Sequence, residues 1–344
     1  SIAGQEGIMP DAAAIMSAAP DPMITFAPEG EIRQVNKAAV SLFGPVPAGV
    51  LARVRLRAPE LRLLIDTALE SGAGGRVEFV DPGPPERWLL ATVTPLGPPS
   101  GLFLLTVRDN SELRRIDRIR ADFIANASHE LRTPLATIKG FVETLKGAAR
   151  EDRNARARFL DIMQAQTERM ARLVDDLLSL SRLETRPLDL TGEIDLREIV
   201  DQVSDALRPL ATENEVTIER RFPDTPVLVS GSRDELAQVF ENLIENALKY
   251  GASGRRITLT IVRAEDGEGA HVEVRDYGPG IPAEHVPRVT ERFYRVDGGS
   301  GATKGTGLGL AIVKHIVQRH GARLAIASQV GQGSCFTVHF PAGT

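Results

Sequence analysis

The stretch that decides the fold is FIANASHELRTPL, residues 123–135. It lies within residues 110–183, where apolar side chains recur every three or four positions and Pro134 is the only proline. Apolar side chains at this spacing share one face of a helix, so the region predicts two long amphipathic helices. The polar segment 147–156 separates them and predicts a helical hairpin, rather than one long coiled-coil linker. Because two such helices cannot bury both apolar stripes on each other, we expect two copies of the chain to form a four-helix bundle.

His129 is the candidate reactive residue of this region. It lies about 200° around the helix from Ala127 and from Leu131, which belong to the apolar stripe. The pattern predicts an imidazole that faces solvent, whereas an isolated helical histidine is more often part of a core. A neutral imidazole has one nucleophilic nitrogen, and Glu130 is placed to fix its tautomer. Pro134 is expected to kink the helix one turn beyond His129.

The regions on either side of the hairpin have different compositions. Short β-like runs alternate with turn signals before it, and one helical stretch, residues 59–71, lies among them; the runs are 23–26, 76–80, 88–93 and 102–107. This pattern predicts a small α+β domain at 1–110. After the hairpin, helices and strands mix: helices near 196–213, 232–250 and 309–321, strands near 257–263 and 271–276, and a closing strand pair. The hairpin is assigned to 111–186, and a two-layer α/β domain to 190–344.

The net charge and the cysteine content exclude some classes of protein. A net charge of −5 argues against a nucleic-acid-binding protein, which usually carries a basic excess. The single cysteine, Cys335, excludes an intramolecular disulfide and fits a reducing compartment. No apolar run is long enough to span a bilayer. We therefore expect a cytoplasmic segment of a protein that is anchored in the inner membrane outside residues 1–344.

Polar residues suited to magnesium and phosphate recur on the predicted helix 232–250. Asn242 and Asn246 are four positions apart and share a face, and Lys249 follows on the same side. Amide oxygens suit Mg²⁺, and a lysine suits phosphate oxygens. Taken alone, a surface asparagine is more often simply solvated.

Two glycine-rich stretches follow. The first, DYGPGI at 276–281, comes directly after a predicted strand, and the second, GTGLGL at 305–310, opens a helix. Glycines there allow backbone N–H groups to approach phosphate at a helix N-terminus. A single run of this kind is more often a plain loop, and its position does not match a dinucleotide-binding βαβ unit.

In this order, the motifs resemble those of two-component sensor histidine kinases. Residues 123–135 resemble the phosphoacceptor box of their HisKA-type dimerisation domain. Four further segments resemble the N, G1, F and G2 boxes of their HATPase_c ATP-binding domain, which has a Bergerat-type fold: NLIENALKY (242–250), DYGPGI (276–281), ERFYR (291–295) and GTGLGL (305–310). The resemblance covers residues 112–341. It implies a homodimer that phosphorylates His129 with ATP and Mg²⁺ and passes the phosphoryl group to an aspartate of a cognate response regulator.

The resemblance also implies roles for individual residues. Glu130 would assist the transfer, and Thr133 would position water to dephosphorylate the regulator. Asn246 would coordinate Mg²⁺ with support from Asn242, and Lys249 would contact phosphate. Tyr250 would pack beside the nucleotide. Asp276 would accept from the adenine amino group, and Gly278 and Gly280 would allow close approach there. Residues 293–304, which include Phe293 and Arg295, would form a mobile lid, and the phosphates would be surrounded by Gly305, Gly307, Leu308 and Gly309.

The N-terminal region resembles a PAS sensor domain. The similarity lies in residues 21–44, DPMITFAPEGEIRQVNKAAVSLFG. The join to the hairpin is most similar to that of the phosphate-regulon sensor kinases. Residues 1–128 contain neither His nor Cys, so we expect neither a His-ligated haem nor a cysteinyl flavin adduct there. A PAS domain that relays a signal without a ligand is the simpler expectation.

Two other functions remain open. The first is an ATP hydrolase of the gyrase and Hsp90 fold, in which a glutamate four residues before the metal-binding asparagine activates water. That position is Asn242 here, and Glu241 and Glu245 lie about 100° or more away from that face. The second is a signalling scaffold without catalysis, which the intact motifs disfavour.

Overall fold

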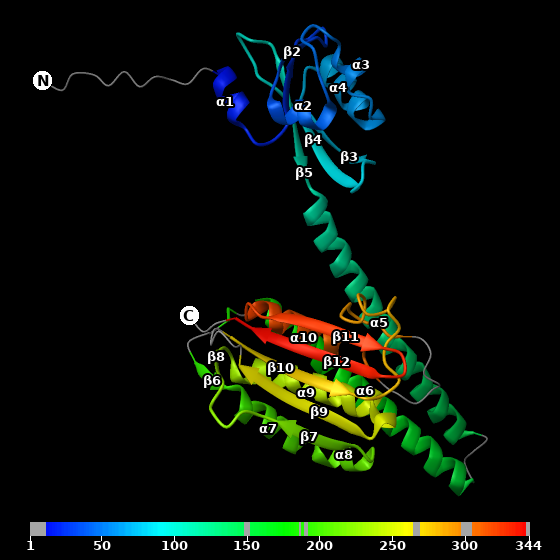
Figure 1. Ribbon diagram of the computed structural model, residues 1–344. Coiled ribbons are helices and arrows are strands. Elements are labelled where there is room, and N and C mark those ends of the chain that lie inside the picture. The colour runs from blue at the N-terminus through cyan, green and yellow to red at the C-terminus, as the bar shows by residue number, and fades with distance from the viewer. Residues whose placement is uncertain are drawn as a thin grey trace, which may run out of the picture. The chain divides into compact units, whose positions relative to one another are not determined.

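The computed structural model describes residues 12–147, 152–185, 187–188, 192–263, 269–296 and 305–341. The chain divides into two compact units, Ser1–Asp122 and Phe123–Thr344 (Figure 1). Within the described ranges, no helix is both long enough and apolar enough to pass through a lipid bilayer.

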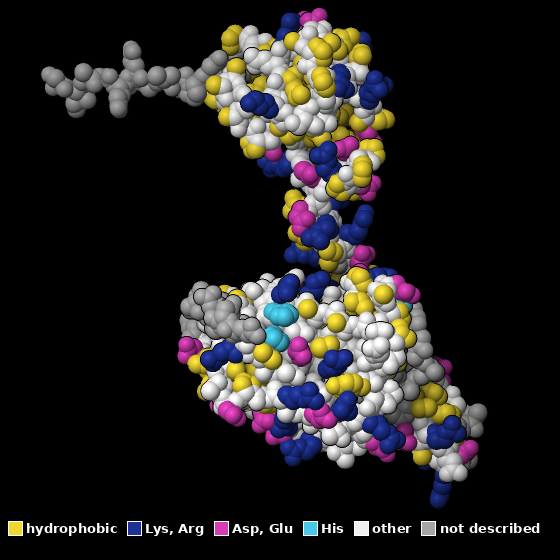
Figure 2. All heavy atoms as spheres, in the orientation of Figure 1, with side chains coloured by type: hydrophobic (Ala, Val, Ile, Leu, Met, Phe, Trp, Pro, Cys, Tyr) yellow, Lys and Arg dark blue, Asp and Glu magenta, His cyan; other side chains and the backbone are white. Residues whose placement is uncertain are grey.

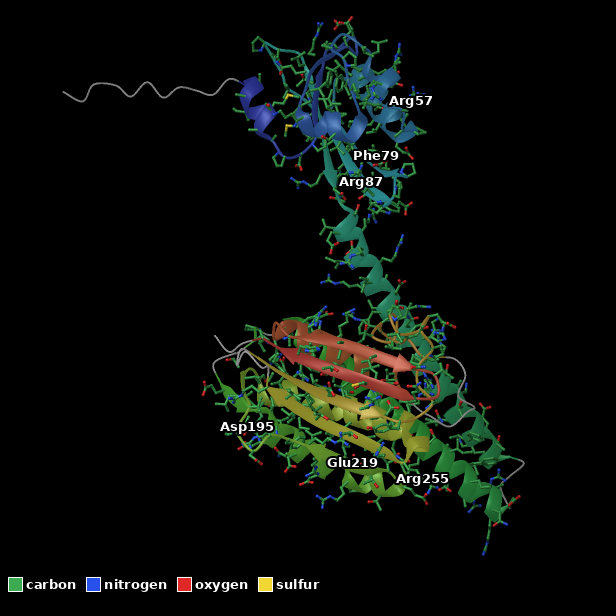
Figure 3. The ribbon with its side chains drawn as sticks, in the orientation of Figure 1. Arg57, Phe79, Arg87, Asp195, Glu219 and Arg255 are labelled. Atoms are coloured by element: carbon green, nitrogen blue, oxygen red, sulfur yellow. The ribbon has the colours of Figure 1, made fainter. Side chains whose placement is uncertain are left out.

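The first unit is an α+β domain, as predicted. Its antiparallel sheet has the strand order β2-β1-β5-β4-β3. The elements are α1 (Ala12–Ala18), β1 (Met23–Phe26), β2 (Ile32–Val35), α2 (Lys37–Phe43), α3 (Ala52–Arg55), α4 (Pro59–Ser71), β3 (Gly75–Asp81), β4 (Arg87–Pro95) and β5 (Phe103–Asp109). One face of the sheet and the inner side of α4 enclose the core. Phe79 is buried there, whereas Arg87 binds Asp81 near the β3–β4 turn (Figure 3).

Asn36 explains how the chain turns between β2 and α2. Its side-chain oxygen accepts hydrogen bonds from the backbone N–H of Met23 and of Ala39, both at 2.9 Å. Its amide nitrogen donates to the carbonyl of Asp21 at 2.8 Å. This buried side chain therefore caps α2 and fixes the entry to β1.

The two long helices are α5 (Ser111–Lys146) and α6 (Arg153–Thr185). They confirm the predicted hairpin arms, and α5 continues without a break through Pro134. Near the hairpin end, Phe141 stacks on Phe159 with ring centroids 4.8 Å apart. The two helices leave apolar side chains exposed in the single chain: Leu113, Ile116, Ile119, Ile124, Leu135, Leu160, Ile162, Val174 and Leu178.

The rest of the second unit is a two-layer α/β arrangement, as predicted. Its five-stranded sheet has the order β11-β12-β10-β9-β7, antiparallel except for the parallel pair β7–β9. The elements are β6 (Glu193–Asp195), α7 (Leu196–Ala206), α8 (Arg208–Glu213), β7 (Thr217–Arg221), β8 (Leu228–Ser230), α9 (Arg233–Tyr250), β9 (Arg256–Arg263), β10 (Ala270–Asp276), α10 (Gly309–Arg319), β11 (Arg323–Gln329) and β12 (Gly333–Phe340), with a short 3₁₀ turn at Ala252–Gly254. The helix expected at 196–213 is divided into α7 and α8, because Pro209 has no N–H to donate to the preceding turn.

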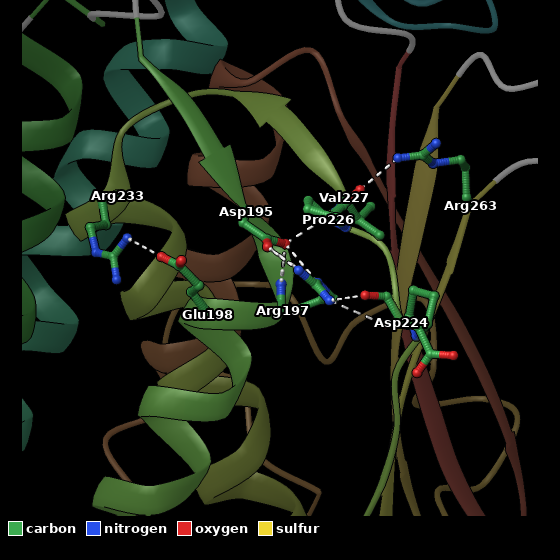
Figure 4. A network of polar contacts seen from close by, with 9 residues as sticks. Asp195, Arg197, Glu198, Asp224, Pro226, Val227, Arg233 and Arg263 are labelled. Carbon is green, nitrogen blue, oxygen red and sulfur yellow. Dashed lines mark hydrogen bonds and ion pairs between the residues drawn. The ribbon is translucent and has the colours of Figure 1, made fainter.

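A polar network fixes the point at which the chain enters this α/β layer. Asp195 caps α7 by accepting from the backbone N–H of Arg197, and it also accepts from that of Val227, both at 3.1 Å. The Arg197 guanidinium returns to Asp195 at 2.8 Å and reaches the carbonyl of Asp224 at 2.7 Å (Figure 4). The start of α7 is thereby joined to the loop before β8.

Helix α6 shares the core of the α/β layer. Its buried residues Leu173, Leu180 and Leu183 belong to the same apolar cluster as those of α9, α10 and the sheet. The C-terminal half of α6 therefore packs on the α/β layer as part of one hydrophobic core.

Candidate phosphoacceptor and nucleotide site

His129 is exposed on α5, which confirms the predicted orientation. An open depression of about 330 Å³ lies beside it. Asn126, His129 and Glu130 of α5 line one side of the depression, and the other side is formed by Arg288, Glu291, Arg292, Phe293 and Tyr294. The histidine thus faces the segment that follows β10 in the α/β layer.

The two neighbours implied to act with His129 have other partners in this arrangement. Glu130 accepts a hydrogen bond from Arg169 of α6 at 2.7 Å. The hydroxyl of Thr133 is exposed and donates to the His129 carbonyl at 3.2 Å. Both side chains therefore lie near the imidazole but are engaged locally.

Helix α9 carries the predicted polar face. Asn242 and Asn246 are both partly buried, and the Asn242 amide nitrogen donates to the carbonyl of Gln238 at 2.9 Å. Lys249 pairs with Glu245 at 2.6 Å, one turn away on the same helix. The ammonium expected to meet phosphate is thus neutralised by a carboxylate of its own helix.

Asp276 lies at the end of β10 and is only 6% exposed. Its carboxylate accepts from the backbone N–H of Gly278 at 2.9 Å, and Ser334 also donates to it. Burial raises the pKa of Asp276 above its ordinary value, although these hydrogen bonds act in the opposite direction. Asp276 is therefore a buried carboxylate that backbone and side-chain donors hold in place at the end of β10.

The glycines of both loops are required by packing inside the protein. A Cβ on Gly280 would lie 2.2 Å from the Gln329 carbonyl oxygen, and one on Gly278 would lie 2.6 Å from the Cα of Gly251. In the second loop, a Cβ on Gly305 would meet the Tyr250 hydroxyl at 2.7 Å. Gly278 and Gly280 therefore pack directly on backbone, whereas Gly305 lies beside the end of the exposed Tyr250 side chain.

The remaining G2 positions fix the start of α10. A Cβ on Gly309 would lie 2.6 Å from Asn242 Oδ1, and one on Gly307, at φ +74°, would lie 2.8 Å from the Cα of Phe293. Leu308 is fully buried, and its backbone N–H donates to the Thr306 hydroxyl at 3.2 Å. The side chain of Leu308 thus belongs to the core, so only its backbone is available near the loop.

The expected lid is described at its first residues only. The backbone N–H of Phe293 donates to Gly307 at 2.8 Å, and its ring packs on Phe123 of α5 at 5.8 Å between centroids. Arg295 follows Phe293 by two residues in the same segment. Residues 297–304 lie outside the described residues.

Sequence reasoning missed the residues of α6 that hold the α/β layer. Asp176 accepts a hydrogen bond from the Thr306 hydroxyl at 2.7 Å, Ser179 bonds Gln238, and Glu184 pairs with Arg292 at 2.6 Å. The available signal was the spacing of Asp176 and Ser179, which places two polar side chains three positions apart beside the apolar stripe. Their partners are more than 50 residues away along the sequence, so no local motif reports the contact.

Family models match three regions of the chain. Residues 231–344 match the histidine kinase-, DNA gyrase B- and HSP90-like ATPase family, and residues 119–186 match the His Kinase A phosphoacceptor domain. Residues 13–76 match a PAS domain. An ATPase-type layer joined to a phosphoacceptor hairpin with an exposed histidine defines a histidine-kinase architecture.

Curated relatives agree with this architecture. The sensor protein kinase WalK of Staphylococcus aureus is 31% identical over 330 residues, which cover 91% of this chain and 76% of the relative. The phosphate regulon sensor protein PhoR of Pseudomonas aeruginosa is 43% identical over 242 residues, or 69% of this chain and 53% of the relative. The chain belongs to the sensor histidine kinase family. It spans only 39% of the Bacillus subtilis WalK sensor histidine kinase, to which it is 38% identical.

Solved structures support the fold. The histidine kinase AdeS of Acinetobacter baumannii aligns with a TM-score of 0.50 and 26% identity, over 63% of this chain and 98% of that one. The histidine kinase ThkA, solved in complex with the response regulator protein TrrA, aligns with a TM-score of 0.54 over 96% of this chain and 98% of that one. Its identity is 20%, so it supports the fold alone.

Proposed function

We propose that this chain is a protein-histidine kinase that moves the γ-phosphoryl group of ATP to His129 and then to an aspartate of a response regulator. The single observation that carries the proposal is the exposed imidazole of His129 in a depression shared with Arg288 and residues 291–294 of the α/β layer. In the first step, an imidazole nitrogen forms a bond to phosphorus while the bond to the bridging oxygen breaks, and ADP leaves. In the second step, the regulator's carboxylate takes the phosphoryl group from the imidazole.

The nucleotide contacts of this proposal lie on α9 and the two glycine loops. The buried carboxylate of Asp276 would receive the adenine amino group, and Lys249 would meet phosphate after leaving Glu245. Asn246 would supply an amide oxygen to Mg²⁺, which takes few protein ligands and keeps phosphate oxygens and water as the others. The bound ion would neutralise phosphate charge, and the protein would contribute mainly positioning.

Water activation is poorly supported by the same site. The position that would carry a hydrolase glutamate is Asn242, whose amide bonds the helix backbone. Glu241 is exposed, and Glu245 is paired with Lys249. These contacts favour transfer to the histidine over hydrolysis.

The proposal includes partners and location. The apolar side chains that α5 and α6 leave exposed in the single chain support a homodimer. The match of residues 119–186 to the His Kinase A phosphoacceptor domain supports a response regulator as the acceptor protein. Removal of phosphate from that regulator, with Thr133 positioning water, belongs to the same proposal, as does an inner-membrane anchor outside residues 1–344.

Labelling with γ-³²P-ATP and Mg²⁺ tests the proposal. We expect protein-bound label that is acid-labile and base-stable, as a phosphoramidate should be, and its loss in His129→Gln. His271→Gln, which removes a histidine from the outer face of the sheet, should keep the label. Label that persists in His129→Gln would contradict the assignment, and fast phosphate release without labelled protein would indicate a hydrolase.

A further inference from the structure

A carboxylate of α6 reaches the loop at 305–309, which the resemblance to histidine kinases places around the phosphates of ATP. Asp176 Oδ2 accepts a hydrogen bond from the Thr306 hydroxyl at 2.7 Å. Thr306 stands between Gly305 and Gly307, and its hydroxyl also accepts from the backbone N–H of Leu308. The contact therefore joins the hairpin directly to the start of the GTGLG segment.

The charges around Asp176 are those of the proposed nucleotide site. Its carboxylate is half-buried, and burial raises its pKa. The charges of Glu245 and Asp175 raise this pKa further, whereas that of Lys249 lowers it, so Asp176 lies close enough to sense the lysine of α9. Lys249 in turn is paired with Glu245. Two carboxylates thus engage a hydroxyl of the loop at 305–309 and the ammonium that is implied to contact phosphate.

We propose that Asp176 takes the place of a nucleotide phosphate at this loop, as an autoinhibitory contact that ATP must displace. Carboxylate and phosphate oxygens are both anionic acceptors, and they compete for the same donors. Two anions held together on one loop repel each other, so nucleotide and Asp176 do not occupy it at once. The inference rests on the proposed binding of ATP at this site.

Three further contacts attach α6 to the α/β layer beside the Asp176–Thr306 hydrogen bond. Ser179 bonds Gln238, Leu183 accepts through its carbonyl from Arg319, and Glu184 pairs with Arg292. These residues continue the face of α6 that begins at Asp176. Displacement of Asp176 by nucleotide would remove one of the attachments of the α/β layer to α6, so nucleotide binding and release of the layer from α6 would be linked reciprocally.

Nucleotide affinity of an Asp176→Asn variant tests the inference. Asparagine keeps an acceptor for Thr306 but removes the negative charge. We expect the Kd for Mg-ATP to fall about tenfold, the free-energy equivalent of about 1.4 kcal/mol. The gain in affinity should be smaller for ADP than for ATP and absent for AMP, because it depends on the charge of the phosphates. Asp175→Asn makes the same charge change at an exposed neighbour and should alter the Kd less than twofold.

Each result has a defined meaning. Unchanged or weaker ATP binding by Asp176→Asn, an equal gain in Asp175→Asn, or a gain that is the same for AMP would overturn the inference. Thermal unfolding establishes that each variant is folded. If Asp176→Asn does not fold, Asp176→Ala takes its place, and we expect the same decrease in the Kd for Mg-ATP. Wild-type protein that binds no nucleotide would refute the proposed function itself, whereas binding without an Asp176 effect refutes only this contact.

Discussion

Arg169 of α6 donates a hydrogen bond of 2.7 Å to the carboxylate of Glu130, the residue that follows His129 on α5. The guanidinium is 21% exposed and the carboxylate 37%, so the pair is partly screened by solvent. It joins the two helices at the level of the proposed phosphoacceptor. Under the proposed function, Glu130 must leave Arg169 before it can support the imidazole.

Replacing Arg169 should therefore accelerate labelling of His129. We expect Arg169→Gln to raise the initial rate about threefold, because the partly exposed pair restrains Glu130 only modestly. The measurement is the initial rate of label incorporation from γ-³²P-ATP. In a Glu130→Gln background the same replacement should have no effect, since a double-mutant cycle isolates the coupling. Equal acceleration in both backgrounds would show that Arg169 acts by another route.

Gly309→Ala should disturb the polar face of α9. The new Cβ would lie 2.6 Å from Asn242 Oδ1, so Asn242 or the start of α10 must shift. We expect a loss of about 1–3 kcal/mol in the free energy of unfolding, together with at least tenfold weaker ATP binding. Denaturant titration and nucleotide titration measure the two effects. Gly140→Ala is the matched control, since its Cβ meets nothing within 4 Å and should stabilise α5 by about 0.5–1 kcal/mol.

A charge on the exposed apolar side of the hairpin should separate the proposed dimer. Leu160 of α6 is 51% exposed in the single chain, and Leu160→Glu would place a carboxylate in the expected bundle interior. We expect the molar mass in light scattering to fall from dimer to monomer at micromolar concentration. Leu63→Glu makes the same change at a 71% exposed leucine of α4 and should leave the mass unaltered. A wild-type monomer would contradict the proposed assembly.

His339 should make the stability of the second unit depend on pH. It faces His271 across β12 and β10 with ring centroids 5.4 Å apart, on a face where Figure 2 shows histidine side chains together. Burial lowers the pKa of His339 below its ordinary 6.5, and the charges of His271 and Arg323 lower it further. The charge of Glu273 acts in the opposite direction and raises this pKa. The unfolded chain therefore binds a proton more readily, so stability falls as pH drops through about 6.5 toward the lowered folded value.

His339→Gln tests this dependence. Between about pH 7.5 and pH 5.5, the Tm of the wild-type protein should decrease more than that of the variant. The difference arises because glutamine has no proton to gain over this range. Parallel Tm profiles for the two proteins would show that His339 does not cause the acid sensitivity.

Local patterns were enough to predict most elements. The helix Pro59–Ser71 has the predicted bounds, since Pro59 suits the first turn and Gly72 closes the helix at φ +68°. The exposure of His129 followed from periodicity alone. By contrast, only the PAS resemblance of residues 21–44 implied the strand and the Asn-containing helix found there as β2 and α2. Local patterns gave no bounds for β2 and α2, because Asn36 fixes them through hydrogen bonds to residues up to 20 positions away.

Contacts between distant segments limited the prediction of the site. The motifs gave candidate residues, but the pairing of Glu130 with Arg169 and of Thr306 with Asp176 spans 39 and 130 positions. Neither arginine nor aspartate on a helix surface is unusual in sequence, and the spacing of Asp176 and Ser179 gives no indication of their partners. The resemblance assigned Gly280 to close approach beside Asp276 and Gly309 to the phosphates. A Cβ on either glycine would collide with the protein itself, a packing requirement that the motifs did not reveal.

The leucines that α6 contributes to the core of the α/β layer, Leu173, Leu180 and Leu183, have a thermal consequence. Any swing of that layer away from α6 must wet these side chains, and hydration of apolar surface raises heat capacity. Apolar association weakens on cooling. The apolar contact between α6 and the α/β layer should therefore be weaker at low temperature than after moderate warming.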